Sequence, residues 1–176
     1  AGISILGLAE TNVPWHDQAV TSQVRKQMCQ NWEESKMATA AAPSSTRETM
    51  YQPGGTALFI QGDWTGRILK ATEDTGDMGR WCTITIQGKN DIKLAIICAY
   101  RPVDQDIANA GTTTNFFQQW MHLRAKGHDK PDPRTQFFIH LGQHVEKLKA
   151  DKHDIMLMMD ANKSTTERNS KVEKLF

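Results

Sequence analysis

The clearest structural pattern in this chain is WCTITIQGKNDIKLAIICAY, residues 81–100. Apolar residues alternate with polar ones on both sides of a turn at residues 88–91, and the apolar set is Cys82, Ile84, Ile86, Ile92, Leu94, Ile96 and Cys98. Alternation with a period of two around a short turn predicts an antiparallel hairpin with one face in the core. Folding about that turn places Cys82 opposite Cys98, where we expect two free thiols that pack as small apolar side chains rather than a functional pair.

Strand and helix patterns alternate through the rest of the chain. Short apolar runs predict further strands at residues 3–9, 54–60, 68–71 and 155–159. Apolar residues at helical spacing predict helices at residues 15–30 and 113–126. A third helix is expected after Asp132-Pro133, with an apolar stripe formed by Phe138, Leu141, Val145 and Leu148. This order predicts an α/β fold in a single domain over residues 1–176, with a central sheet covered by helices.

The composition excludes several classes of protein. With 21 basic and 20 acidic residues among 176, the net charge is +1, which rules out a polybasic arm or an acidic tail but allows a local basic patch. No apolar run approaches the length of a membrane span, and the first residues do not form a secretory signal pattern. Three cysteines do not make a disulfide scaffold, so we expect an intracellular globular protein in a reducing compartment.

Candidate chemistry gathers where the predicted strands end. Glu10 and Asp160 each follow a short apolar strand, and Tyr100-Arg101 closes the hairpin. A charge at the end of an apolar strand must be solvated, paired or bound to a metal, because burying it alone is very costly. Each acid by itself could simply mark the end of its strand. Together these oxygen ligands suit Mg²⁺, and with a phenol, a guanidinium and the Asn162 amide they favour hydrolysis of a phosphate ester.

Four short motifs resemble those of the endonuclease/exonuclease/phosphatase superfamily, in the same order along the chain. LGLAET at residues 6–11 resembles its metal-binding motif, GGTA at 54–57 its paired-glycine strand, AYRP at 99–102 its tyrosine-proline motif and MDAN at 159–162 its Gly-Asp-Phe-Asn motif. The Glu-Thr-Asn and Tyr-Arg-Pro variants are most similar to the endonuclease domains of non-LTR retrotransposons, which are themselves similar to apurinic/apyrimidinic endonucleases. The resemblance spans almost the whole chain and implies a four-layer α/β/β/α sandwich.

The resemblance implies a magnesium-dependent hydrolase that nicks DNA and leaves a 3′-hydroxyl. By position, Glu10 would ligate Mg²⁺, with Mn²⁺ as a substitute, and Tyr100 would contact the scissile phosphate. Asp160 would orient and deprotonate the attacking water, and Asn162 would position the active site or stabilise the transition state. Substrate contacts are expected from three further residues, Thr11, Asn12 and Arg101. DNA would be the partner of a monomeric, nuclear protein that is linked to a reverse transcriptase in its parent polypeptide.

The sequence also departs from the family pattern. The family's first strand, with its active-site asparagine, and its late aspartate-histidine pair have no match, so we expect a domain that lacks the first strand and the C-terminal catalytic segment and turns over little. Strand alternation also turns Arg101 away from the face used by Tyr100. Two alternatives remain open: a phosphatase or phosphodiesterase of the same fold acting on a small phosphoester, and a non-catalytic remnant that binds DNA or a protein.

Three further groups have a structural interpretation and a functional alternative. One predicted loop contains Arg124, Lys126, Lys130 and Arg134. We expect these side chains to form a solvated surface, and the alternative is that they follow a DNA backbone. Trp64 and Trp81 are expected in the core, with base stacking as the alternative. His140 and His144 stand four residues apart on a predicted helix and are expected to be solvated rather than to share a metal.

Overall fold

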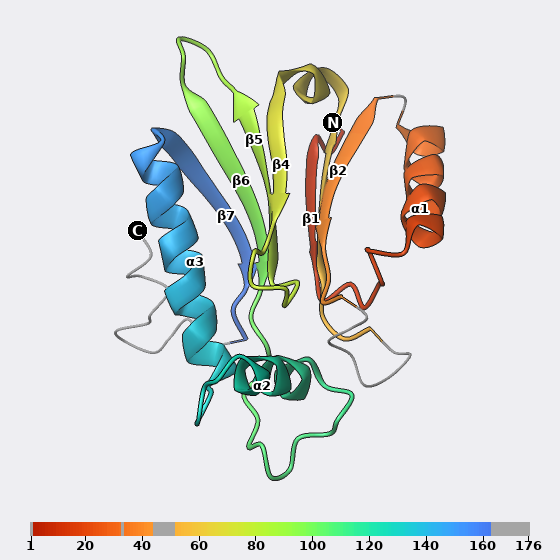
Figure 1. The fold of residues 1–176 in the computed structure, drawn as a ribbon. Helices are drawn as coiled ribbons and strands as arrows, with labels where there is room; N and C mark the ends of the chain where they lie inside the picture. The colour runs from red at the N-terminus through yellow and green to blue at the C-terminus, as the bar shows by residue number, and fades with distance from the viewer. Residues whose placement is uncertain (1, 33, 44–51, 163–176) are drawn as a thin grey trace.

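A computed structural model of the chain describes residues 2–32, 34–43 and 52–162 (Figure 1). In chain order its elements are β1 (Ile5–Ala9), α1 (Gln18–Asn31), β2 (Ser35–Ala40), β3 (Thr56–Gln61), the 3₁₀ helix η2 (Gly62–Arg67), β4 (Ile68–Glu73), β5 (Trp81–Gln87), β6 (Lys93–Tyr100), α2 (Asn115–Ala125), α3 (Pro133–Ala150) and β7 (His153–Asp160). The α/β class predicted from the sequence is confirmed. Within the described ranges, no helix is both long enough and apolar enough to cross a lipid bilayer.

The strands form two sheets. Sheet A has the order β1-β3-β2 and is antiparallel throughout, whereas sheet B has the order β4-β5-β6-β7 and is antiparallel except for the parallel pair β6–β7. The predicted hairpin is the β5–β6 pair, and its register places Cys82 opposite Cys98 as expected. Ile92 differs from the prediction because it lies in the turn before β6, where it is 50% exposed instead of buried.

The two sheets face each other across an apolar core. The residues buried between them are Ala38, Ala40, Leu58, Ile60, Cys82, Ile84, Ile86, Ile96 and Cys98. Gly7 in β1 brings that strand close to sheet B, since a Cβ atom at this position would lie 2.9 Å from Met158 Cε and 3.1 Å from Cys98 Sγ. The absence of a side chain at Gly7 therefore lets the end of β1 approach the ends of β6 and β7.

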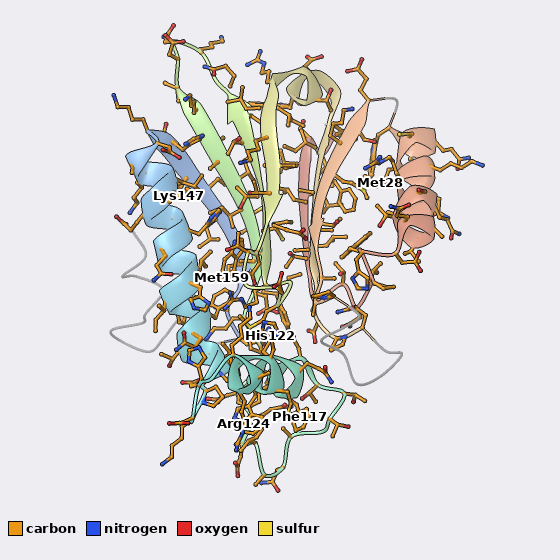
Figure 2. All side chains as sticks on the ribbon, viewed as in Figure 1. Met28, Phe117, His122, Arg124, Lys147 and Met159 are labelled. Atoms are coloured by element: carbon orange, nitrogen blue, oxygen red, sulfur yellow. The ribbon has the colours of Figure 1, made fainter. Side chains whose placement is uncertain are left out.

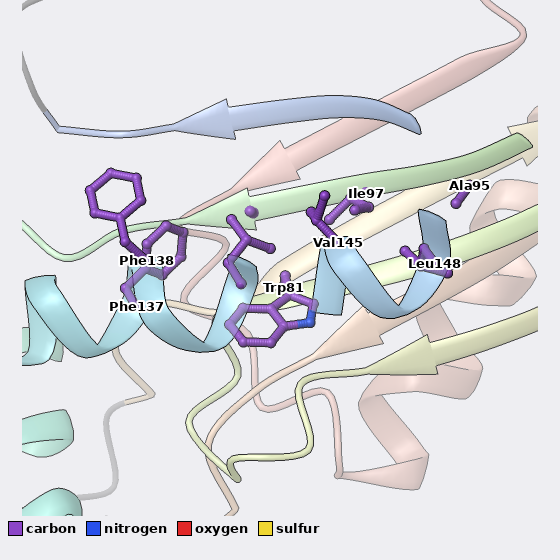
Figure 3. Close-up of a cluster of buried hydrophobic side chains, with 9 residues drawn as sticks. Trp81, Ala95, Ile97, Phe137, Phe138, Val145 and Leu148 are labelled. Atoms are coloured by element: carbon purple, nitrogen blue, oxygen red, sulfur yellow. The ribbon is translucent and has the colours of Figure 1, made fainter. Parts of the chain in front are cut away.

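Helix α3 covers the outer face of sheet B (Figure 3). The helix begins at an N-cap, Asp132, whose side chain accepts hydrogen bonds from the backbone of Arg134 and Thr135. The predicted apolar stripe is buried against the sheet, as expected for Phe138, Leu141, Val145 and Leu148. Trp81 is also buried there, as predicted, whereas Trp64 lies on η2 and is 37% exposed, so the prediction of a core position is wrong for Trp64.

Helix α1 lies against the outer face of sheet A. Its partly buried Val24 and Met28 pack near a cluster formed by Trp15, Ala57 and Phe59. The helix starts three residues later than predicted, because the Asp17 side chain accepts hydrogen bonds from the first backbone N–H groups and so caps it. In Figure 1, α1, sheet A, sheet B and α3 follow one another across the molecule, and α2 lies across the lower end.

The three cysteines have different surroundings. Cys82 and Cys98 are free thiols in the core between the sheets, as predicted, whereas Cys29 is exposed on α1. Burial raises the pKa of Cys82 and raises the pKa of Cys98 to about 11. The two core thiols are therefore protonated at neutral pH and pack as small apolar groups.

Candidate functional site

Three strand ends meet at the lower end of the molecule in Figure 1. The parallel register of β6 and β7 makes Tyr100 and Asp160 direct neighbours, and the Arg101 backbone N–H donates to the Asp160 carbonyl at 2.9 Å. Glu10 follows β1, which approaches the same end of sheet B through Gly7. The topology therefore brings together residues that lie 60 to 150 positions apart in the chain, as the sequence predicts for ends of neighbouring strands.

Tyr100 links the other two strand ends, because it pairs in register with Asp160 and lines the same cleft as Glu10. Burial raises the pKa of Tyr100, and so do its hydrogen-bonding and electrostatic interaction with Glu10 and the charge of Asp160, whereas Asn162 acts in the opposite direction. Both carboxylates and the amide are therefore within interaction range of one phenol. A phenol is protonated at neutral pH, and the raised pKa of Tyr100 extends this to higher pH, so Tyr100 is a neutral hydrogen-bond donor.

Asn162 fixes the segment that follows β7. Its backbone N–H donates to Asp160 Oδ1 at 3.0 Å, and its side-chain Nδ2 donates to the Arg101 carbonyl at 2.7 Å. Asn162 also has a φ of +46°, a left-handed conformation that asparagine tolerates better than most residues. These interactions hold the Asp160 carboxylate in one orientation beside Tyr100.

The turn after Glu10 is held by the paired glycines. Asn12 exchanges hydrogen bonds with Gly54, its N–H donating to the Gly54 carbonyl at 2.7 Å and its Oδ1 accepting from the Gly54 N–H at 2.9 Å. Gly54 and Gly55 have φ values of +72° and +84°, which only glycine adopts without strain. Thr11 Oγ1 accepts a hydrogen bond from Trp15 Nε1 at 2.8 Å, so Thr11 anchors the loop while Asn12 borders the open space beside Glu10.

A cleft of about 510 Å³ opens beside the cluster. Glu10, Asn12 and Tyr100 form one wall, and the rest of the lining is Pro53, Val103, Gln105, Thr113, Thr114, Asn115 and Phe116. The last four residues are the N-terminus of α2 and its approach, where the Thr114 side chain caps the helix by accepting from the Phe117 N–H. A helix N-terminus carries partial positive charge, so this wall favours an anion.

Sequence reasoning missed the α2 wall of the cleft. The signal was present in the sequence, since a Thr-Thr-Asn run before an aromatic helix is an N-cap pattern. The pattern gives the start of a helix, but it does not say that this start faces Glu10 from across the fold. That placement depends on tertiary packing.

Arg101 does not join the cluster. Its Nη1 donates to the Ala161 carbonyl at 3.3 Å, and its guanidinium carbon lies 4.5 Å from the centroid of the Phe138 ring, on the α3 side of the sheet. Burial and the nearby charge of Arg134 lower the pKa of Arg101 to about 10. Arg101 therefore supports the segment after β7 from behind, and this position does not agree with the substrate contact that the sequence predicts for Arg101.

Arg134 is the second correction. The sequence places it in a solvated basic loop, but it belongs to α3 and is 7% exposed. Its Nη1 donates to the Pro102 carbonyl at 2.6 Å and its Nη2 to the Asn162 carbonyl at 3.1 Å. Arg134 thus ties together the two segments that follow Tyr100 and Asp160, and it is not available to track DNA.

His144 is the third correction. The sequence pattern predicts a solvated side chain, but His144 is half-buried, with its Nε2 3.0 Å from Thr83 Oγ1 and its ring centroid 5.9 Å from that of Trp81. Burial lowers the pKa of both His140 and His144. These histidines belong to the α3–sheet B interface.

The donor set of the cluster fits a hard divalent cation. It contains two carboxylates, Glu10 and Asp160, and within the described ranges no three or more His, Cys, Asp or Glu side chains gather as potential metal ligands. Mg²⁺ is commonly held by one or two carboxylates and completes its shell with waters and substrate phosphates. Zinc would require nitrogen or sulfur ligands that this cluster does not offer.

Comparison with known proteins assigns no family, since no protein-family model and no curated protein sequence matches this chain.

Proposed function

We propose that this chain is a magnesium-dependent phosphodiester hydrolase of the endonuclease/exonuclease/phosphatase type that acts on DNA. The observation that carries the proposal is the meeting of three strand ends: Tyr100 pairs in register with Asp160, and Tyr100 lines the same cleft as Glu10. The succession of α1, sheet A, sheet B and α3 supports the four-layer sandwich of that superfamily as the fold.

Each residue of the cluster has a role that follows from its chemistry. Glu10 would hold Mg²⁺, which supplies positive charge to the phosphate as negative charge develops on it. Asp160, held by the Asn162 N–H, would accept the proton of the attacking water. Tyr100, a protonated phenol at neutral pH, would donate a hydrogen bond to a phosphate oxygen. Asn162 would act as a positioning residue, because its side chain is bound to the Arg101 carbonyl.

The open form of the site favours a polymer over a small molecule. Both carboxylates are exposed to solvent, and the cleft beside Glu10 is an open one that extends to the α2 N-terminus. Sites for small molecules usually enclose most of the ligand surface. A strand of DNA can instead pass through an open cleft and present one phosphodiester to Glu10 and Asp160.

The proposal is tested by nicking of supercoiled plasmid in Mg²⁺, with the protein in excess over DNA and long incubation so that slow cleavage is detected. Glu10→Gln and Asp160→Asn should each slow nicking by about 10²–10⁴-fold. Asp154→Asn is the matched control, because Asp154 is an exposed acid on the same strand and face as Asp160 but at the opposite end, and it should nick normally. Equal nicking rates for Asp160→Asn and Asp154→Asn would refute the proposal.

A metal-binding measurement separates the cation site from turnover. Mn²⁺ binding followed by electron paramagnetic resonance should weaken by at least about tenfold in Glu10→Gln and remain unchanged in Asp154→Asn. Unchanged Mn²⁺ binding in Glu10→Gln would remove Glu10 from the site. Phosphate release from a small phosphomonoester, with no nicking of plasmid, would replace DNA by a small phosphoester as the substrate.

A further inference from the structure

Helix α2 buries Phe116 and Leu123 in the usual way, but it also buries two glutamines and leaves two aromatic residues partly exposed. Gln118 and Gln119 are 4% and 2% exposed, whereas Phe117 and Trp120 are only partly buried. In Figure 2, Phe117 and Arg124 lie on the side of α2 turned away from the sheets, and His122 lies on the side turned toward them, where its Nε2 is 2.9 Å from the Gly76 carbonyl. A helix of a globular protein normally turns its aromatic residues to the core.

The outward aromatic residues form an ordered stack with an arginine. The Phe117 and Trp120 ring centroids are 6.2 Å apart with an interplanar angle of 30°, and the Arg124 guanidinium carbon lies 5.1 Å from the Trp120 centroid. These three residues stand at i, i+3 and i+7, so they follow one side of the helix. We name this set, Phe117, Trp120 and Arg124, the α2 outer face.

The α2 outer face begins where the cleft ends. Phe116 lines the cleft with Glu10 and Tyr100, and Phe117 is the next residue of the helix. From Phe117 to Arg124 the helix rises by about 10 Å, since each residue adds about 1.5 Å. That length corresponds to about three stacked nucleotides at about 3.4 Å each.

The charge beyond the stack suits a phosphate backbone. Lys126 and Lys130 follow Arg124 in the exposed segment after α2, and Lys126 lies 3.8 Å from Asp77. Arg124 therefore adds positive charge at the far end of the α2 outer face, whereas Lys130 follows six residues later, next to the exposed Asp129. Proteins that bind single-stranded nucleic acid combine a positive track with aromatic rings on which bases stack. Duplex DNA offers no such contact, because its bases are already stacked inside the helix.

We propose that the α2 outer face is a stacking platform for unpaired bases of single-stranded DNA. The proposal rests on the proposed function in one respect, that the stacked strand is the one whose backbone enters the cleft. Binding to the platform requires no metal and no cleavage, so it can be measured separately.

The test is fluorescence anisotropy with a fluorescein-labelled oligothymidylate and with a duplex of the same length, both in EDTA. Trp120→Ala should weaken binding of the single strand by about 5- to 150-fold, from a loss of about 1–3 kcal/mol for one base stack. Binding of the duplex should change less than twofold. Trp120→Phe should restore most of the affinity, since an aromatic face remains. Arg124→Gln should lower the slope of log affinity against log salt by about 0.7.

The chain offers a matched control for this substitution. Trp64 is also partly exposed and has Arg67 beside it, 5.6 Å from the ring centroid, but both lie on η2 at the opposite end of the molecule (Figure 1). Trp64→Ala should bind both DNAs as the unmodified chain does. Equal losses in Trp64→Ala and Trp120→Ala, or no loss in Trp120→Ala, would overturn the platform. A dimer that Trp120→Ala converts to a monomer, with unchanged DNA affinity, would also overturn it in favour of contact between two copies.

The outcomes separate the platform from the proposed hydrolase. Single-strand binding that depends on Trp120, in a chain that never nicks DNA, would support the platform and refute the hydrolase. Nicking that depends on Asp160, together with single-strand binding that is the same in Trp120→Ala, would refute the platform and support the hydrolase.

Discussion

Replacing Arg134 by methionine is expected to destabilise the fold by about 3–6 kcal/mol. Arg134 donates one hydrogen bond to the Pro102 carbonyl at 2.6 Å and one to the Asn162 carbonyl at 3.1 Å. Hydrogen bonds that involve a charged group contribute about 1.5–3 kcal/mol each, and loss of the donor leaves a buried carbonyl without a partner. Methionine keeps most of the apolar stem, so the loss reports the guanidinium rather than the packing.

One interaction acts in the opposite direction. The charge of Arg134 disfavours the charged form of Arg101, so its removal relieves that repulsion and brings the sum toward the lower half of the range. A loss of this size is a large part of the 5–15 kcal/mol that a domain of ordinary stability has. It should also loosen the Asp160–Asn162 segment and slow any reaction that depends on it.

Urea unfolding followed by tryptophan fluorescence and circular dichroism measures the change. Arg134→Lys should fall between the unmodified chain and Arg134→Met, because one ammonium group does not reproduce the fork of a guanidinium. Arg25→Met, at an exposed position on α1, should change the free energy of unfolding by less than about 0.5 kcal/mol. A loss below about 1 kcal/mol in Arg134→Met, or one equal to that of Arg25→Met, would show that the two hydrogen bonds do not stabilise the site.

Three further substitutions test the fold. Gly79→Ala should destabilise the chain more than Gly62→Ala. Both glycines have a φ near +63°, a conformation that costs alanine about 1–2 kcal/mol. Only at Gly79 would the new Cβ lie 2.4 Å from backbone atoms of Ala41. Equal losses of stability would contradict the steric part of this argument. Leu141→Ala should cost about 2–5 kcal/mol in urea unfolding, since this side chain of α3 is fully buried against sheet B. Burial lowers the pKa of His144 below 6.5, so the unfolded chain binds more protons at this residue than the folded chain as the pH falls. The urea concentration at the unfolding midpoint should therefore decrease when the pH is lowered from about 7 to about 5. His144→Gln should make this decrease smaller, and an unchanged decrease would exclude His144 as its cause.

The sequence predicted those elements whose structure is determined by residues close together in the chain. The β5–β6 hairpin was predicted with its register, because alternation around a short turn leaves one way to pair Cys82 with Cys98. Strand β2, SKMATA, was not predicted, because it shows no clean alternation of apolar and polar residues. Its strand conformation comes from pairing with β3, where Ser35 lies opposite Gln61 and Ala40 opposite Thr56.

In the candidate site, too, local patterns were predicted, whereas contacts between distant parts of the chain were not. Glu10, Tyr100 and Asp160 were singled out because each ends a strand, and strand ends can meet. Arg134 was misread because nothing in its neighbours reveals the two carbonyl groups that it binds, one after β6 and one after β7. The burial of polar side chains and the exposure of aromatic ones on α2 likewise depend on what the rest of the fold presents to that helix.

The contrast among the cysteines also makes the protein simple to label. Maleimides react with thiolates, and the two core cysteines are shielded and protonated, so Cys29 is the residue that a maleimide dye should modify in the folded state. Its helix lies across the molecule from α3 and away from α2 (Figure 1). Labelling at Cys29 would thus place one dye at one position without replacing the other two cysteines. The labelled protein would suit single-molecule or energy-transfer measurements, with the fluorophore remote from the cleft.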